Sequence, residues 1–147
     1  MYKRILIATD GSDLSRKATD SGIDLAETLG AQVFMLNVIP RYPLSYFEGG
    51  VSVPALDVAR IEKQWTDSAQ RMLNDLKDSA EARGLKAKAV TARSDVVADA
   101  ILAAAKKHKC DLIVMASHGR KGLKRLLLGS ETTQVLTHSP IPVLVLR

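Results

Sequence analysis

The sequence predicts an α/β protein with an open, parallel five-stranded sheet and helices on both faces of that sheet. Short runs of aliphatic residues alternate along the chain with longer segments whose apolar residues recur at helical spacing. The aliphatic runs are almost continuously apolar, as is typical of strands that are buried on both faces. Strict alternation of strand and helix favours a parallel sheet with right-handed crossovers.

The first third of the chain predicts a strand, a helix and a second strand. Residues 2–8 (YKRILIA) are apolar and β-branched at their centre, which indicates a buried strand. Residues 9–13 (TDGSD) are a turn cluster in which Asp13 is the favoured N-cap. Residues 14–29 then follow helical spacing up to a glycine stop, and residues 32–39 (QVFMLNVI) indicate a second buried strand.

The middle of the chain predicts a loop, a long helix and a strand at the edge of the sheet. Residues 41–54 (RYPLSYFEGGVSVP) show no period and are interpreted as a loop, which is either a lid or partner contact or a plain surface excursion. Residues 55–83 carry one apolar face over the longest helical stretch. Residues 86–92 (KAKAVTA) alternate polar and small apolar residues, which favours an edge strand.

The last third predicts two helices and two strands. Ser94 is the expected N-cap of a helix whose inward positions lie within residues 97–105. Residues 111–116 (DLIVMA) indicate a buried strand, and residues 130–137 a short final helix. The chain ends on an apolar strand made of Val143, Leu144, Val145 and Leu146. Because an apolar edge strand invites pairing with another chain, we expect a homodimer through these four residues.

Composition limits the kinds of function that the chain can have. With 147 residues and no visible boundary or repeat, residues 1–147 are expected to form a single domain. The formal charge is +5, but aromatic residues are few and no helix-turn-helix or zinc-finger spacing is visible, which argues against nucleic acid as a partner. One cysteine and scattered histidines exclude a multi-cysteine metal site and suit the cytoplasm. No apolar run approaches the ~20 residues of a membrane span.

Two polar segments are expected to meet at one place in the sheet. With the strand order 3-2-1-4-5, a ligand crevice lies between the carboxyl ends of the first and fourth strands. The first strand ends in Ala8, Thr9 and Asp10, and the fourth ends in Met115 and Ala116. Ser117, His118 and Gly119 follow the fourth strand, and a second glycine precedes the last helix. A buried strand, a glycine loop and a helix N-terminus together are typical of an anion site.

The chain resembles the universal stress proteins. The resemblance rests on the opening KRILIATDGSDLSRKA, the segment DLIVMASHGRKGLKRLLLGS and the ending SPIPVLVLR. ATP-binding members of that family resemble one another in a G-x-x-G-x9-G-[ST] motif. Here Gly119, Gly129 and Ser130 match that motif, whereas Ala116 stands where the first glycine is expected. The resemblance implies a Rossmann-like fold and binding of ATP, with Mg²⁺ as its companion ion and AMP or ADP as further candidates.

The resemblance also implies roles for particular residues. Asp10 would meet the ribose or adenine end of the nucleotide, and Val38 would offer backbone contacts to adenine. The complete set of expected nucleotide-binding residues is Ala8, Thr9, Asp10, Val38, Met115, Ala116, His118, Gly119, Arg120, Gly129, Ser130, Glu131 and Thr132. Asp10 has a second interpretation as a turn cap, and His118 as a loop-packing residue. Glu131 suits the start of a helix and is expected to face solvent.

These observations predict a cytoplasmic, homodimeric stress-response protein that senses adenine nucleotide and regulates an unknown protein partner. No side chain is assigned as a catalytic base and none as a metal ligand, so at most slow ATP hydrolysis is expected. The alternative interpretation is a nucleotide-free dimer that acts through protein contacts, which Ala116 favours.

Overall fold

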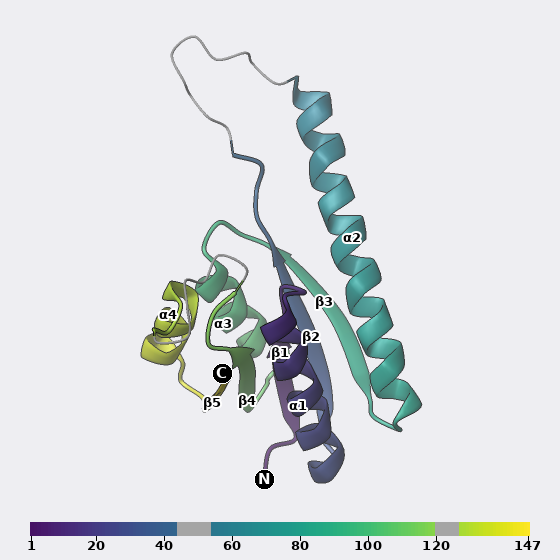
Figure 1. Ribbon diagram of the computed structural model, residues 1–147, viewed down its shortest axis with the longest axis vertical. Coiled ribbons are helices and arrows are strands. Elements are labelled where there is room, and N and C mark those ends of the chain that lie inside the picture. The colour runs from purple at the N-terminus through teal and green to yellow at the C-terminus, as the bar shows by residue number, and fades with distance from the viewer. Residues whose placement is uncertain (44–53, 120–126) are drawn as a thin grey trace.

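The predicted fold class is confirmed by the computed structural model, in which residues 1–43, 54–119 and 127–147 are described. These residues form one parallel sheet with the strand order β3-β2-β1-β4-β5 (Figure 1). The strands are β1 Arg4–Ala8, β2 Gln32–Ile39, β3 Ala87–Arg93, β4 Leu112–Ala116 and β5 Val143–Leu146. The helices are α1 Asp13–Leu29, α2 Ala55–Ala82, α3 Val97–Lys107 and α4 Ser130–His138.

Two apolar layers hold the helices against the sheet. Side chains of successive strand residues point to opposite faces, so each strand contributes to both layers. Ile5, Ile7 and Val114 pack on the face that is covered by α1 and α2. Leu6 and Ile113 pack on the other face, beneath α3 and α4. The strands are therefore buried on both sides, which explains their continuous apolar sequences.

The start of α1 differs from the sequence prediction by one residue. Ser12, and not Asp13, is the N-cap: its backbone is extended and its side chain accepts a hydrogen bond from the Ser15 amide. Asp13 is the first helical residue and is exposed, where its charge suits the positive end of the helix dipole. Adjacent serine and aspartate have the same capping chemistry, so only the backbone angles decide between them.

The start of α3 also differs from its prediction, whereas the start of α4 agrees with it. Ser94 does not cap α3, which begins at Val97; instead its hydroxyl accepts a hydrogen bond from the Val96 amide in a short turn before the helix. Helix α4 begins at Ser130, as predicted, and Gly129 takes the extended cap position before it. The Ser130 hydroxyl donates to the Glu131 carboxylate at 3.0 Å.

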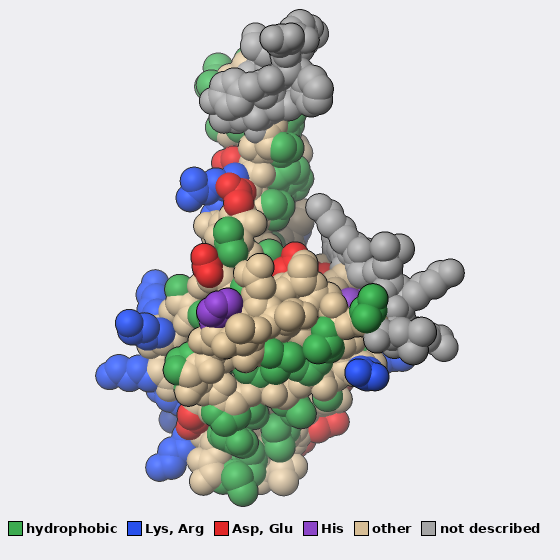
Figure 2. All heavy atoms as spheres, turned by 90° about the vertical axis from the view of Figure 1, so that its left-hand side faces the viewer, with side chains coloured by type: hydrophobic (Ala, Val, Ile, Leu, Met, Phe, Trp, Pro, Cys, Tyr) green, Lys and Arg blue, Asp and Glu red, His purple; other side chains and the backbone are tan. Residues whose placement is uncertain are grey.

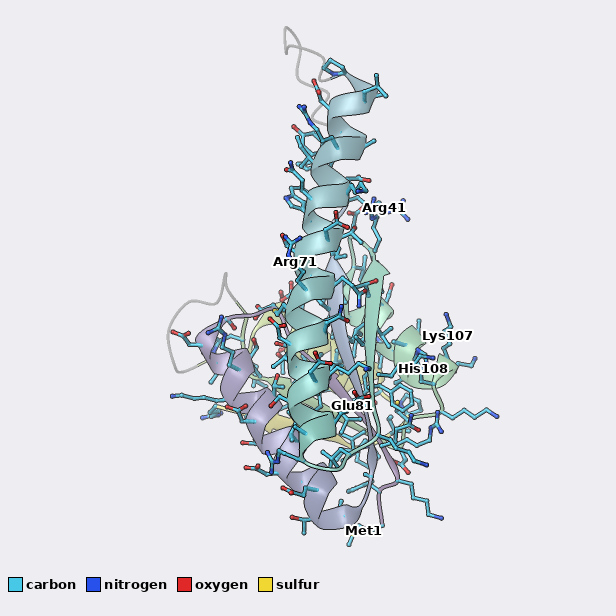
Figure 3. The ribbon with its side chains drawn as sticks, turned by 90° about the vertical axis from the view of Figure 1, so that its right-hand side faces the viewer. Met1, Arg41, Arg71, Glu81, Lys107 and His108 are labelled. Atoms are coloured by element: carbon cyan, nitrogen blue, oxygen red, sulfur yellow. The ribbon has the colours of Figure 1, made fainter. Side chains whose placement is uncertain are left out.

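Helix α2 is longer than the sheet that it covers. Its carboxyl half packs on the sheet through Leu73 and Ala80, while its amino half extends past the carboxyl ends of the strands (Figures 1 and 3). Leu56 is 85% exposed at that far end, whereas Trp65 is half-buried and stacks on Tyr42. The apolar face predicted along this helix is therefore only partly used by the core. No helix among the described residues is long and apolar enough to span a membrane.

Two parts of the sequence prediction lie outside the described residues. These are most of the loop predicted at residues 41–54 and the segment 120–126, which contains Arg120.

Candidate functional site

The carboxyl ends of β1 and β4 lie side by side at the centre of the sheet. The two strands pair in parallel, with Ile7 opposite Val114. The chain leaves β1 towards α1 on one face of the sheet and leaves β4 towards α4 on the other. Departure to opposite faces separates the two loops and opens a crevice between them, which is where α/β proteins of this topology bind ligands. The two polar segments predicted to meet, after β1 and after β4, both lie at this crevice.

The loop after β1 is held by hydrogen bonds that fix the position of Asp10. The Thr9 amide donates to the Leu36 carbonyl at 2.9 Å, and the Asn37 side-chain amide donates to the Thr9 carbonyl at 2.8 Å. Beyond them, the Ser12 amide donates to one Asp10 carboxylate oxygen at 2.9 Å. Gly11 completes the turn with a φ of +78°, a conformation that glycine adopts without strain. Asp10 is consequently half-buried and presented at the edge of the crevice.

The other carboxylate oxygen of Asp10 faces Gly119 across the crevice. A Cβ placed on Gly119 would lie only 2.6 Å from that oxygen, closer than any side-chain carbon can approach. The β1 loop and the β4 loop are therefore in contact, 109 residues apart in sequence by their numbering (119 − 10). Any side chain at residue 119 would require the Asp10 carboxylate to shift, because the backbone passes directly beside it.

Ser117 is the first residue after β4 and forms two backbone hydrogen bonds. The Ser117 amide donates to the Leu146 carbonyl at 2.7 Å, which extends the pairing of β4 with β5 by one residue. The Ser117 carbonyl accepts from the Gly129 amide at 2.8 Å, so Gly129 lies beside the end of β4. A Cβ on Gly129 would lie 3.3 Å from the Cα of His118. Gly129 therefore allows two backbone segments to approach each other closely, whereas Gly119 lies against the Asp10 side chain.

The amino end of α4 lies at the base of this loop. Gly129 is the N-cap, and the first amides of a helix have no intrahelical acceptor, so they attract anions. The Thr132 hydroxyl is buried and donates to the Ala116 carbonyl at 3.0 Å, which ties the helix to the end of β4. The Thr132 side chain therefore has a structural role. The Glu131 side chain is exposed, as expected from the sequence.

The remaining predicted residues lie near the crevice with differing accessibility. Ala8 and Val38 are half-buried at the carboxyl ends of β1 and β2. Met115 is 6% exposed and packs in the layer under α3 and α4, so only its backbone is offered to a ligand. The His118 ring is half-buried, with Nδ1 3.2 Å from the Ser117 hydroxyl.

The Ala116 methyl is placed by the alternation of the strand. Residue 116 has the parity of Leu112 and Val114, whose side chains pack on the α1 face. Helix α4 belongs to the opposite face through Val135. The methyl group therefore points away from the helix N-terminus that would face an anion.

The positioning roles of two residues were not predicted from the sequence. Asn37 is the only polar residue inside the run VFMLNVI, and that interruption was the available signal. Ser117 acts through its backbone, which carries no sequence signal at all. Among the described residues, no group of three histidine, cysteine or carboxylate side chains is placed to hold a metal ion.

Comparison with known proteins agrees with this geometry. The model of the Usp (universal stress protein) family matches residues 1–147. The chain belongs to the universal stress protein family. Universal stress protein MJ0531 of Methanocaldococcus jannaschii is 35% identical to it over 148 residues, which cover 100% of this chain and 83% of that protein. The family resemblance seen in the sequence is thereby confirmed.

Solved structures of universal stress proteins share the fold. Protein MJ0577 of M. jannaschii superposes with a TM-score of 0.83 at 29% identity, over 99% of this chain and 96% of that one. A universal stress protein in complex with cAMP superposes with a TM-score of 0.71 at 25% identity, over 99% and 97% of the two chains. An adenine nucleotide is therefore bound by a protein whose fold extends over nearly the whole of this one.

Proposed function

We propose that this protein binds an adenine nucleotide in the crevice between β1 and β4. ATP accompanied by Mg²⁺ is the favoured ligand, and AMP and ADP are further candidates. The protein acts as a cytoplasmic regulator in stress responses, with residues 1–147 working as one domain. Nucleotide binding selects the conformation that docks onto a protein partner, because a ligand shifts the population of the state that it binds more tightly.

The contact between the Asp10 carboxylate and the Gly119 backbone carries this proposal. It brings an acceptor for ribose hydroxyls to within a few ångströms of a glycine loop that ends on a helix N-terminus. Hydroxyl groups of a ribose donate to carboxylates, and phosphates are bound by backbone amides and helix ends. A nucleotide has both groups in one molecule, so it matches both sides of the crevice.

One group of residues is proposed to contact the nucleoside of such a ligand, and another group its phosphates. Asp10, with the backbone of Ala8, Thr9 and Val38, serves the nucleoside. The backbone of residues 116, 118 and 119 and the first turn of α4 serve the phosphates, together with Arg120. Mg²⁺ would be held chiefly by phosphate oxygens and water, as this ion usually is in nucleotide sites.

The Ala116 substitution is compatible with this arrangement. Its methyl group belongs to the α1 face of the sheet, whereas the helix N-terminus that would receive phosphate belongs to the opposite face. We therefore expect Ala116 to leave the phosphate end of the crevice open. Hydrolysis is expected to be slow at most, because the sequence assigns no side chain as a catalytic base.

The homodimer is proposed through β5. This strand is the edge of the sheet, and its Leu144 side chain is 37% exposed. Hydrophobic side chains gather on the face of the molecule that bears β5 and α4 (Figure 2). An apolar edge strand of one protomer can extend its sheet into the same strand of its partner, which would bury both edges.

Thermal unfolding with a series of nucleotides tests the proposed ligand class. ATP at a large excess over its dissociation constant should raise the melting temperature, since a ligand that binds only the folded state stabilises it. ADP and AMP should raise it less, and inorganic triphosphate alone should have little effect. A melting temperature that no adenine nucleotide changes would refute the proposal.

A further inference from the structure

Three helices of this protein end with the same backbone geometry but not with the same residue. After α1, α2 and α3 the chain adopts a left-handed conformation, with φ values of +64°, +83° and +53°. The next amide then returns to a helix carbonyl: Ala31 to Ala26 at 2.9 Å, Leu85 to Ala80 at 3.2 Å and Cys110 to Ala105 at 2.8 Å. The left-handed residue is Gly30, Gly84 and Lys109, in that order.

Lysine is an unfavourable choice at such a helix end. A Cβ in the left-handed region is strained, and glycine avoids this strain. Within the described part of the chain, Lys109 is the only residue other than glycine with a positive φ. The dipole of α3 does not require it, because Lys106 and Lys107 already supply positive charge in the last turn. A role for the Lys109 side chain itself would explain why it occurs here.

The Lys109 side chain borders an open hollow in the surface. The hollow has a volume of about 510 Å³, within the usual range for small-molecule sites. It lies between α3 and the segment that leads into β5. Apart from two lysines, its lining is apolar and includes no acidic residue: Leu102, Ala103, Ala105, Lys106, Lys109, Cys110, Ile113, Pro140 and Ile141.

The charges at the rim of this hollow have one sign. Lys106 and Lys109 are both exposed, and neither forms an ion pair with another described residue. The Cys110 thiol at the wall is buried, which raises its pKa to about 11 and keeps it neutral at pH 7. The nearby carboxylate of Asp111 is turned away, accepting hydrogen bonds from the amides of Lys3 and Arg4.

We propose that this hollow binds a small amphiphilic carboxylate, with its apolar body against α3 and its carboxylate between Lys106 and Lys109. An apolar wall with two cations at its edge is complementary to an acyl chain that ends in one negative charge. The hollow lies beside the amino end of β4, where Cys110 and Ile113 are, whereas the nucleotide crevice is at the carboxyl end. The two sites are therefore separate, and this proposal does not depend on nucleotide binding.

Calorimetric titration with decanoate, in the absence of nucleotide, tests the proposal. The wild-type protein should bind decanoate, and decyltrimethylammonium, with the same chain and a positive head, should bind about tenfold more weakly or not at all. Ala103→Phe, which fills the hollow without altering a charge, should abolish binding. Absence of decanoate binding to the wild type, or equal binding of the cationic detergent, would overturn the proposal.

Replacing Lys109 separates a ligand role from a structural one. Lys109→Gly should raise the melting temperature by a few degrees because it relieves backbone strain. The same variant should bind decanoate about tenfold more weakly. Lys107→Ala is the matched control, since Lys107 is exposed in the same turn but does not line the hollow. If Lys109→Gly and Lys107→Ala bind decanoate equally well, Lys109 is not a ligand residue and the proposal fails.

Discussion

At the scale of single residues, the crevice depends on a backbone that passes directly beside a carboxylate. Gly119→Ala would place a methyl group 2.6 Å from the Asp10 oxygen, and the carboxylate would have to turn away. Because Asp10 is held by the Ser12 amide through its other oxygen, this movement also disturbs the β1 loop. We expect the affinity for ATP to fall by about tenfold or more in a calorimetric titration.

A second glycine provides the control for this variant. Gly30→Ala strains the backbone after α1, at φ +64°, but lies at the other end of the sheet. It should lower the free energy of unfolding by about 1 kcal/mol while leaving the affinity for ATP unchanged. Equal affinity of Gly119→Ala and wild type would show that the Asp10–Gly119 contact is not part of the nucleotide site.

His108 is a residue whose surroundings oppose its protonation. Its ring stacks on Phe34 with centroids 4.9 Å apart, and its Nε2 is buried without a hydrogen-bond partner. Burial lowers the pKa of His108, and the positive charges of Lys88, Lys107 and Arg4 lower that pKa further. Lys107 and His108 lie together at the end of α3 (Figure 3).

The lowered pKa of His108 predicts a loss of stability in acid. The unfolded chain takes up a proton at His108 near pH 6.5, whereas the folded protein does so only at lower pH. The free energy of unfolding should therefore be at its full value above about pH 6.5 and fall as the pH drops towards the folded pKa. Urea denaturation of His108→Phe should show a weaker pH dependence in this range than the wild type.

The exposed His138 serves as the reference for that experiment. His138→Gln is the matched control, because it removes a histidine whose side chain is at the surface. If His108→Phe and His138→Gln behave alike, the buried ring does not cause the acid sensitivity.

Prediction from sequence is weakest at this scale. The helix cap predicted at Asp13 was wrong because the adjacent Ser12 offers equivalent capping chemistry, and only the backbone angles distinguish the two residues. The cap predicted at Ser94 was wrong because α3 begins later, after Val96, without a side-chain cap. The contact of Asp10 with Gly119 could not be predicted either, since it depends on the register of β1 with β4 and on the shape of both loops.

At the scale of elements, α1 packs unusually close to the sheet. A Cβ on Gly22 would lie 2.7 Å from Cδ1 of Ile7 and 3.4 Å from Cγ1 of Val114. Ile7 is fully buried, so its side chain has little room to move. Gly22→Ala gains about 1 kcal/mol of helix propensity, but overpacking costs about 1–3 kcal/mol. We expect a net loss of about 1 kcal/mol in the free energy of unfolding.

The Ile7→Val background tests whether the close contact causes that loss. Valine lacks the Cδ1 atom that a Cβ at residue 22 would meet at 2.7 Å but keeps the Cγ1 atom at 3.0 Å, so there the Gly22→Ala substitution should cost less than in the wild type. Urea denaturation of the two single variants and the double variant gives the coupling energy, which should be about 1–2 kcal/mol in favour of the double variant. If the effects of the two substitutions on the free energy of unfolding are additive, the contact between residues 22 and 7 does not set the distance between α1 and the sheet.

The elements themselves were largely predictable from the sequence. Burial controls the hydrophobic pattern of a strand directly. The apolar runs of β1, β2 and β4 reflect burial on two faces, and the alternating sequence of β3 reflects its partly exposed place at the edge of the sheet. The pattern could not show that the amino half of α2 extends beyond the sheet. An apolar helix face looks the same in sequence whether or not a sheet lies against it.

At the scale of the whole molecule, β5 provides a test of the proposed assembly. Leu144→Glu introduces a charge at the exposed edge of the sheet, where a partner strand would have to bury it. Analytical ultracentrifugation should show a dimer for the wild type and a monomer for this variant. Lys88→Glu, on the opposite edge strand β3, should remain dimeric. A wild-type monomer, or a dimer in the Leu144→Glu variant, would contradict assembly through β5.

The central claim, that the crevice binds an adenine nucleotide despite Ala116, is tested most directly by calorimetric titration of ATP and Mg²⁺ into the wild type and Ala116→Gly. Because the Ala116 methyl lies on the α1 face, both proteins should bind one ATP per chain, with dissociation constants that differ by no more than about threefold. Binding by Ala116→Gly alone would contradict the claim and favour a nucleotide-free protein that acts through protein contacts. Binding by neither protein would contradict it as well.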